Sequence, residues 1–415
     1  MKKITFILFL LTQIVLAQTP CVEGFAGEYP CNGYDLMSHI SNATLGNPST
    51  EGNDSWGWTD PDTQKEYALM GIDSGIVFID ISDPVEPIII GTLNSSTVTS
   101  PWRDVKVYDS HAFIVSEANS HGMQVFDLKR LRNPSNTIIP YTADTTFMGF
   151  GSAHNIVINE ESGYAYIVGA SRNSTYGGGP IFINIQDPVN PVIEGGFAEG
   201  GYSHDAQVIT YSGPDTDYTN KEILIGSNEN EIVIADVTDK TNPIVISKIT
   251  YSNVKYAHQG WFTEDLKYFI LGDEVDELQI GNKTRSIIFD FTDLDNPLYH
   301  FDYFGSTSAI DHNGYVKDNV YYQANYTAGV RMIDVSNTEN KSFSEIGFFD
   351  TFPNNNSTAF NGVWNVYPYF PSGNIIISDI DNGFFVIRKS GTLNIVPKTA
   401  RTNFSMYPNP AKSQT

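Results

Sequence analysis

The sequence predicts an all-β fold, a β-propeller of seven four-stranded blades. Two observations predict it: a strand-pair phrase recurs along the whole chain, and no sustained helical period follows the first residues. Units of this kind, about fifty residues long, close into a ring that leaves few strand edges exposed. A parallel β-helix has shorter repeats, and a β-sandwich does not repeat one phrase throughout. Six or eight blades would follow if the two ends contribute differently.

The first recurring phrase is an alternating apolar strand, a tight turn containing Asp and Pro, and a second strand. Proline cannot donate a hydrogen bond to a ladder, so it marks the turn of a hairpin. The clearest copies are VFIDISDPVEPIIIG (77–91), IFINIQDPVNPVIEG (181–195), IVIADVTDKTNPIVIS (232–247) and IIFDFTDLDNPLYHF (287–301).

A second phrase precedes each hairpin and supplies two more strands. Aligned anchor residues recur at intervals of 47 to 54 residues, one for each blade. In the last blade, residues 383–389 form the third strand, and the fourth comes either from 392–396 or from the N-terminal extension. The anchors are Trp56, Arg103, His154, His204, His258, His312 and Trp364.

The two ends carry other signals. Lys2 and Lys3, an apolar run and Ala17 predict a secretory signal peptide cleaved before Gln18, too short to span a bilayer. The two cysteines, Cys21 and Cys31, predict a disulfide in an exported chain, with two free thiols as the alternative. The predicted divisions are a signal peptide (1–17), an N-terminal extension (18–52), the propeller (53–398) and a C-terminal segment (399–415).

The Asp-Pro hairpins resemble LVIVD repeats, and the run over about residues 21–390 resembles the choice-of-anchor B family. The stretches that carry this resemblance include WRDVKVY, GFGSAHNIVIN, GYSHDAQV and HQGWFTED. The tail FSMYPNPAKSQT (404–415) is similar to the start of a type IX secretion sorting domain. These resemblances imply export by a Bacteroidetes-like bacterium, to the medium or the cell surface, and no particular reaction.

Four of the eight histidines are anchors of four consecutive blades: His154, His204, His258 and His312. That position opens the innermost strand, so the four imidazoles are expected around one mouth of the central channel. The second strand of each blade ends at the same face and brings carboxylates there, among them Asp273 and Glu274. Imidazole and carboxylate together are ligands for zinc, iron, manganese or copper. The alternative is that each histidine is a buried polar group that bridges blades by hydrogen bonds.

Other residues predicted at this face would serve a ligand. Arg103 could hold an anionic group or pair with Asp104, and exposed tryptophans could form binding platforms, Trp56 and Trp58 among them. The further candidates are Asp205, Trp102, Trp364, Asp73, Glu117 and Asp379.

The formal net charge of −24 argues against nucleic acid or anionic membrane partners. Three acidic loops (59–66, 213–220 and 272–279) could bind calcium, but none has EF-hand spacing and we favour solvated loops. No catalytic cysteine or Gly-x-Ser-x-Gly elbow is present.

Two functions therefore compete. One is a monomeric binding module for an extracellular protein, peptide or glycan. The other is a metal-dependent hydrolase or oxidoreductase that uses the channel histidines, with Asp273 or Glu274 as general base.

Overall fold

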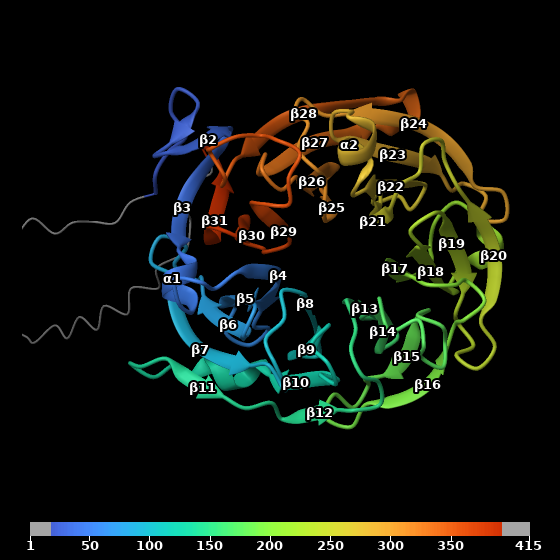
Figure 1. The fold of residues 1–415 in the computed structure, drawn as a ribbon, viewed down its shortest axis with the longest axis horizontal. Coiled ribbons are helices and arrows are strands. Elements are labelled where there is room, and N and C mark those ends of the chain that lie inside the picture. Colours follow the sequence, from blue (N-terminus) through green and yellow to red (C-terminus); the bar gives the residue numbers. More distant parts are fainter. Residues whose placement is uncertain (1–17, 392–415) are drawn as a thin grey trace, which may run out of the picture.

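The computed structural model describes residues 18–391 and shows a seven-bladed β-propeller (Figure 1). Seven antiparallel sheets are arranged around one axis, and each has four principal strands. The innermost strands are β4 (Gly52–Thr59), β8 (Arg103–Tyr108), β13 (Asn155–Asn159), β17 (Asp205–Thr210), β21 (Ala257–Phe262), β25 (Gly314–Lys317) and β29 (Val363–Tyr367). The second strands are β5 (Glu66–Ile72), β9 (His111–Ser116), β14 (Tyr164–Val168), β18 (Glu222–Ser227), β22 (Tyr268–Asp273), β26 (Val320–Ala324) and β30 (Asn374–Asp379).

The outer half of each blade is the hairpin that the Asp-Pro phrase predicts. The third strands are β6 (Gly75–Asp80), β10 (Met123–Asp127), β15 (Ile181–Asn184), β19 (Ile232–Asp236), β23 (Arg285–Asp290), β27 (Val330–Asn337) and β31 (Gly383–Lys389). The outermost strands are β7 (Ile88–Asn94), β12 (Thr145–Phe147), β16 (Val192–Gly196), β20 (Ile244–Ile249), β24 (Leu298–Phe304), β28 (Ser342–Phe349) and β3 (Tyr34–Ile40).

The remaining elements are short. Strand β11 (Ile139–Tyr141) pairs in parallel with β7, and the hairpin of β1 (Phe25–Ala26) and β2 (Tyr29–Asn32) extends blade six through β28. The helices are α1 (Asn42–Leu45), α2 (Asp276–Ile280) and the 3₁₀ turns η1 (Leu128–Arg132), η2 (Thr216–Tyr218) and η3 (Thr338–Asn340). None of the helices in residues 18–391 has the length and apolar character needed to cross a membrane.

The repeated phrase has a physical reason. At the end of the third strand an Asp accepts a hydrogen bond from the backbone N–H two residues later, as Asp80 does from Ser82 and Asp236 from Thr238. This local bond ends the strand and begins the turn. A β-bulge then recurs between the third and fourth strands, for example at Phe78 and Ile79.

The ring is closed by the N-terminal segment. Strand β3 pairs antiparallel with β31 and is the outer strand of blade seven, beside the C-terminal strands in Figure 1. This realises one of the two predicted alternatives, and residues 392–396 lie outside the described residues. The predicted boundary at residue 53 is wrong, because residues 18–52 include strands of blades six and seven. A disulfide joins Cys21, which precedes β1, to Cys31 in β2.

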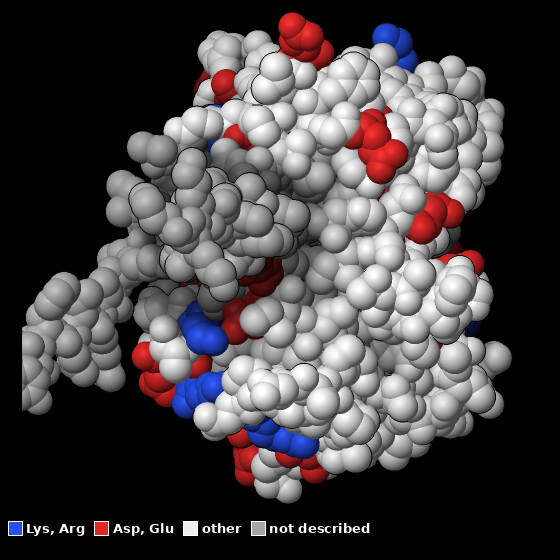
Figure 2. All heavy atoms as spheres, turned by 90° about the vertical axis from the view of Figure 1, so that its left-hand side faces the viewer, with Lys and Arg blue, Asp and Glu red and all other residues white. Residues whose placement is uncertain are grey.

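The core lies between neighbouring blades rather than at one centre. Every residue of the second and third strands of blade one is buried, for instance. Charged side chains are scattered over the side that Figure 2 shows, and most of that face carries neither sign. The predicted signal peptide (1–17) and sorting segment (399–415) both lie outside the described residues.

Candidate metal centre at the channel mouth

The four anchor histidines form the predicted arc at one mouth of the channel. Each stands at or just before the start of an inner strand, so successive blades bring successive imidazoles side by side. Ring centroids are 4.4 Å apart for His154 and His204, 4.5 Å for His204 and His258, and 4.5 Å for His258 and His312. The even spacing follows from the rotation that relates one blade to the next.

Three of these rings are oriented through Nδ1. His154 Nδ1 lies 2.7 Å from Glu117 Oε1, and His204 Nδ1 lies 3.0 Å from the Tyr256 hydroxyl. His312 Nδ1 donates to the backbone carbonyl of Trp364 at 2.6 Å. A carbonyl only accepts, so the neutral ring of His312 carries its proton on Nδ1 and leaves an Nε2 lone pair free.

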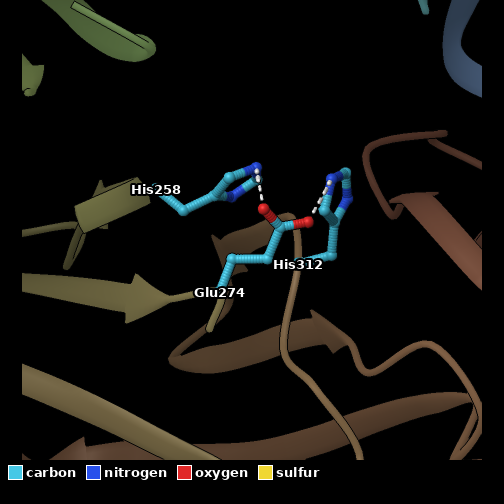
Figure 3. A group of neighbouring side chains, drawn as sticks. All are labelled: His258, Glu274 and His312. Atoms are coloured by element: carbon cyan, nitrogen blue, oxygen red, sulfur yellow. Dashed lines mark ion pairs between the residues drawn. The ribbon is translucent and has the colours of Figure 1, made fainter. Parts of the chain in front are cut away.

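Two imidazoles converge on one carboxylate, as Figure 3 shows. His258 Nε2 lies 3.7 Å from Glu274 Oε2, and His312 Nε2 lies 3.8 Å from Glu274 Oε1. Glu274 follows directly after β22, whose end meets the start of β21 at this mouth. Single ligand atoms of His258, Glu274 and His312 lie within 4.8 Å of one another.

Burial controls the charge of this group. It lowers the pKa of His312 to about 3 and lowers the pKa of His204 and of His258 well below the ordinary value. The rings are therefore neutral near pH 7. Burial also raises the pKa of Glu274 to about 7, although the Tyr326 hydroxyl, which donates to Oε1 at 2.7 Å, opposes this. Two neutral imidazoles thus face a carboxyl group that lacks a cationic partner.

Unpaired nitrogens also lie along the arc. His204 Nε2 and His258 Nδ1 are buried and have no hydrogen-bond partner in the described part of the chain. A fully satisfied blade-bridging network would leave neither nitrogen unpaired. The alternative that each histidine bridges blades by hydrogen bonds therefore fits His154, which is paired with Glu117. It does not fit His258, whose Nδ1 has no partner.

Asp273 is not part of this group, and its prediction as a ligand or general base is wrong. Its Oδ2 accepts hydrogen bonds from the Tyr251 hydroxyl and the Lys255 N–H, both at 2.7 Å. Its Oδ1 accepts the Tyr256 N–H at 2.7 Å. These bonds hold the loop that precedes β21, so the carboxylate is turned away from the imidazoles.

Arg103 is also placed differently from the prediction. Its side chain is buried, Nε donates to the Ile72 carbonyl, and NH1 lies 3.0 Å from His121 Nε2. Burial lowers the pKa of Arg103 to about 10, opposed by the charge of Asp73. Arg103 and Asp73 therefore belong to the packing between blades one and two. Asp104 pairs with Lys106 instead of Arg103.

Asp379 has a structural role as well. It accepts hydrogen bonds from Thr351 Oγ1 and from the backbone of Asp381 and Asn382, which shapes the β30–β31 turn. Neither Asp379 nor Asp73 lines the cavity at the mouth. Asp205 lines a different cavity, deeper in the channel.

The mouth is a cavity of about 390 Å³ that contains the arc. Trp102, Trp364 and Glu117 line it as predicted. The prediction missed Tyr202, Tyr256, Tyr326 and Phe360, which also line it. One signal could have found two of them, because Tyr202 and Tyr256 stand two residues before a histidine of the arc.

Two other tryptophans are not at this face. Trp58 is a core residue with 5% exposure, and Trp56 lines the deeper cavity. The anchor of blade one is Asn53 rather than Trp56. Asn53 lies 50 residues before Arg103, the anchor of blade two, and its Oδ1 accepts a hydrogen bond from the Arg103 N–H. The predicted alignment is therefore three residues out of register in that blade.

The acidic loops differ in their contacts. In 59–66, the guanidinium of Arg132 bonds to both carboxylate oxygens of Asp60. In 272–279, Asp276 pairs with Arg285 at 2.5 Å. In 213–220, Asp215 lies near Asp293 and Asp295, an acidic group at the surface. In loops 59–66 and 272–279, an arginine guanidinium therefore pairs with the carboxylate that a calcium ion would need.

Comparison with known proteins supports the fold. No family model matches the chain, and no curated protein matches it. Among solved structures, Kuenenia stuttgartiensis hydrazine synthase is similar over 83% of this chain and 96% of that chain, with a TM-score of 0.56 and 12% identity. The Myceliophteria thermophila Cps50 (Swd1) β-propeller domain is similar over 82% and 99%, with a TM-score of 0.50 and 8% identity. At these identities the similarity concerns the fold alone.

Proposed function

We propose that this propeller is an exported binding module that holds a transition-metal ion between His258, Glu274 and His312 and binds its partner at the channel mouth. One observation carries the proposal: two buried, neutral imidazoles face one carboxylate through Nε2, and the Nδ1 hydrogen bond of His312 leaves its Nε2 lone pair free. A metal ion would satisfy these groups together, and a hydrogen-bond network does not.

The geometry suits a small ion. With metal–nitrogen bonds of about 2.1 Å, tetrahedral ligands lie about 3.4 Å apart. The two nitrogen–oxygen distances of 3.7 Å and 3.8 Å are close to this value. The hydrogen bond from His312 Nδ1 to the Trp364 carbonyl also fixes the tautomer that a ligand needs.

The types of ligand limit which metal ions the site would favour. Two histidines and one carboxylate favour Zn²⁺ or Fe²⁺, with Mn²⁺ and Cu²⁺ as further members of the same class. Three protein ligands leave at least one coordination position for water or a bound molecule. Glu274 and both imidazoles line the cavity, so that position would be accessible from the mouth.

Purified full-length protein stripped with chelator is expected to bind one Zn²⁺ or Co²⁺ per chain. The variant His258→Ala with His312→Ala is expected to lose this binding, because one carboxylate cannot hold the ion alone. Elemental analysis gives the stoichiometry, and the visible absorption of Co²⁺ reports on the ligand geometry.

His300→Gln is the matched control. His300 lies on β24, its Nε2 is hydrogen-bonded to the Thr338 carbonyl, and it does not line the mouth cavity. This variant should bind metal as the unmodified protein does. A metal-free unmodified protein that takes up no ion on titration would contradict the proposal, as would equal binding by the double histidine variant.

The walls of the cavity indicate the chemistry of the partner. Trp102 is 42% exposed and Phe360 is 46% exposed, and both stand at the rim of a site with buried polar groups below. Exposed aromatic faces beside polar groups suit a peptide or a glycan. The net charge of −24 remains unfavourable for nucleic acid.

A metal-dependent hydrolase or oxidoreductase is the second candidate, and one observation favours it. The His154–Glu117 pair lies on the same cavity as the three ligands and could move a proton near the metal. Metal-dependent turnover of an ester or a redox dye, lost in Glu117→Gln while metal binding persists, would favour this candidate over pure binding.

Export rests on the sequence signals at residues 1–17 and 404–415. The intact mass of protein secreted by its own host is expected to begin at Gln18, because a signal peptidase would cleave after Ala17. A mature protein that retains residues 1–17 would contradict export by this route.

A further inference from the structure

A second polar site lies deeper in the channel. One residue from each blade forms a ring around the channel. Each directly follows the anchor position, and lies in the inner strand or, for Asn313, just before it. Its members are Asp54, Asp104, Asn155, Asp205, Gln259, Asn313 and Asn365. Six of them line a cavity of about 60 Å³, together with Lys106 and Glu160, while Asn365 contacts the ring through Asp54 and Asn313.

About half of the ring side chains have all their hydrogen-bond partners within the protein. Asp104 accepts hydrogen bonds from Val105 N–H, Lys106 Nζ and Ile156 N–H. Gln259 Nε2 donates to the Gly314 carbonyl, and Gln259 Oε1 accepts the Gly314 N–H. These contacts fix the ring and leave nothing for a ligand.

The other half is not satisfied. Asn155 is 8% exposed, and its side chain makes no hydrogen bond in the described part of the chain. Asn313 Oδ1 is buried and has no hydrogen-bond partner, while its Nδ2 donates to Asp54 Oδ2 at 3.1 Å. Asp205 uses only Oδ1, which accepts the Ala206 N–H. Three residues from three blades, each with an unpaired oxygen acceptor, therefore line one cavity.

The charge of this space is unbalanced. Four carboxyl groups line it, from Asp54, Asp104, Asp205 and Glu160, against the single ammonium group of Lys106. Burial raises the pKa of Asp205 to about 7 and that of Asp54 well above its ordinary value, and neighbouring carboxylates add to both shifts. These shifts keep Asp54 and part of Asp205 protonated near pH 7, and a bound cation would favour the ionised form of both carboxyl groups.

We infer that the ring binds one Ca²⁺ ion, held by Asp205 and the amide oxygens of Asn155 and Asn313 with water in the remaining positions. Oxygen-only ligands select a hard cation, and Ca²⁺ accepts six to eight of them in irregular, partly hydrated arrangements. The cavity has room for an ion and a few water molecules. This site is separate from the metal proposed at the mouth, which uses imidazole nitrogen.

Calorimetric titration of chelator-treated, full-length protein with CaCl₂ tests the site. The unmodified protein should bind one Ca²⁺ per chain, and its thermal midpoint should rise with Ca²⁺ concentration. Asp205→Asn should weaken the affinity about tenfold or more, because it removes ligand charge while its Oδ1 can still accept the Ala206 N–H.

Two controls separate this site from the others. Asp215→Asn with Asp295→Asn neutralises the acidic group at the surface and should leave binding unchanged. His258→Gln alters the mouth and should also leave it unchanged. If Asp205→Asn does not fold, Asn155→Ala takes its place, since that side chain has no hydrogen bond to lose. The inference is overturned if the unmodified protein shows no saturable binding, if the ring variant binds equally, or if the surface variant loses binding.

Discussion

Deletion of residues 18–40 is expected to abolish cooperative folding of the whole ring. Without β3, blade seven loses its outer strand, and the buried residues of β31 border an open edge. The buried residues of the deleted segment include four large apolar side chains: Tyr29, Tyr34, Met37 and Ile40. At about 1.5–3 kcal/mol for each, they account for about 6–12 kcal/mol, comparable with the total stability of a domain of about 5–15 kcal/mol. Chemical denaturation followed by circular dichroism gives the measurement.

The control keeps the strand and removes only the covalent link. Cys21→Ser with Cys31→Ser leaves the β3–β31 pairing in place and should cost about 3 kcal/mol, as expected for a short closed loop. This variant should still unfold in one transition. A deletion variant that unfolds at the same denaturant concentration as the full chain would show that three strands suffice for blade seven.

The blade count was predictable because the repeat has a local cause. The Asp at the end of a third strand forms its turn with the residue two positions later, so the same letters recur wherever the same turn does. The ring closure was not predictable in this way. The pairing of β3 with β31 joins residues more than three hundred positions apart, and no local pattern distinguishes it from a strand at 392–396.

The candidate site was predictable in position but not in detail. The spacing of four histidines placed them at one mouth, since an equal step in sequence becomes an equal rotation in a ring. The choice between Asp273 and Glu274 was beyond the sequence. These neighbours occupy opposite sides of the strand end, and only the packing of Tyr251 and Tyr326 decides which carboxylate meets the imidazoles.

The register error in blade one has a similar origin. Trp56 matches Trp364, the anchor of blade seven, in residue type, so the sequence alone points to Trp56 as the anchor of blade one. Hydrogen bonding identifies Asn53 instead, because the side chain of Asn53 contacts the next anchor, Arg103. The same error hid Asp54, so three acidic positions of the deeper ring were not recognised as one set.

Lys240→Met is expected to destabilise the protein by about 3–5 kcal/mol. Lys240 Nζ lies 2.6 Å from Glu222 Oε2, and each side chain is 8% exposed. Glu222 also accepts hydrogen bonds from Asn159 Nδ2 and Ser162 Oγ, so this ion pair joins blade four to blade three. Removing the ammonium group leaves a buried carboxylate without a cationic partner. The free energy of unfolding, measured by urea denaturation, should show the loss.

A second mutation distinguishes this cause from simple loss of packing. Adding Glu222→Gln to Lys240→Met removes the buried charge, so the double variant should be more stable than the sum of the single losses predicts, by about 1–3 kcal/mol. Lys248 and Glu231 provide a matched pair at 3.0 Å in the same blade, with exposures of 38% and 29%. Lys248→Met should cost at most about 1 kcal/mol, because water already screens an exposed pair. Additive losses at Lys240 and Glu222, or equal losses at the two lysines, would mean that the buried pair contributes through shape alone, and the connection between blades three and four would then rest on the apolar contacts around it.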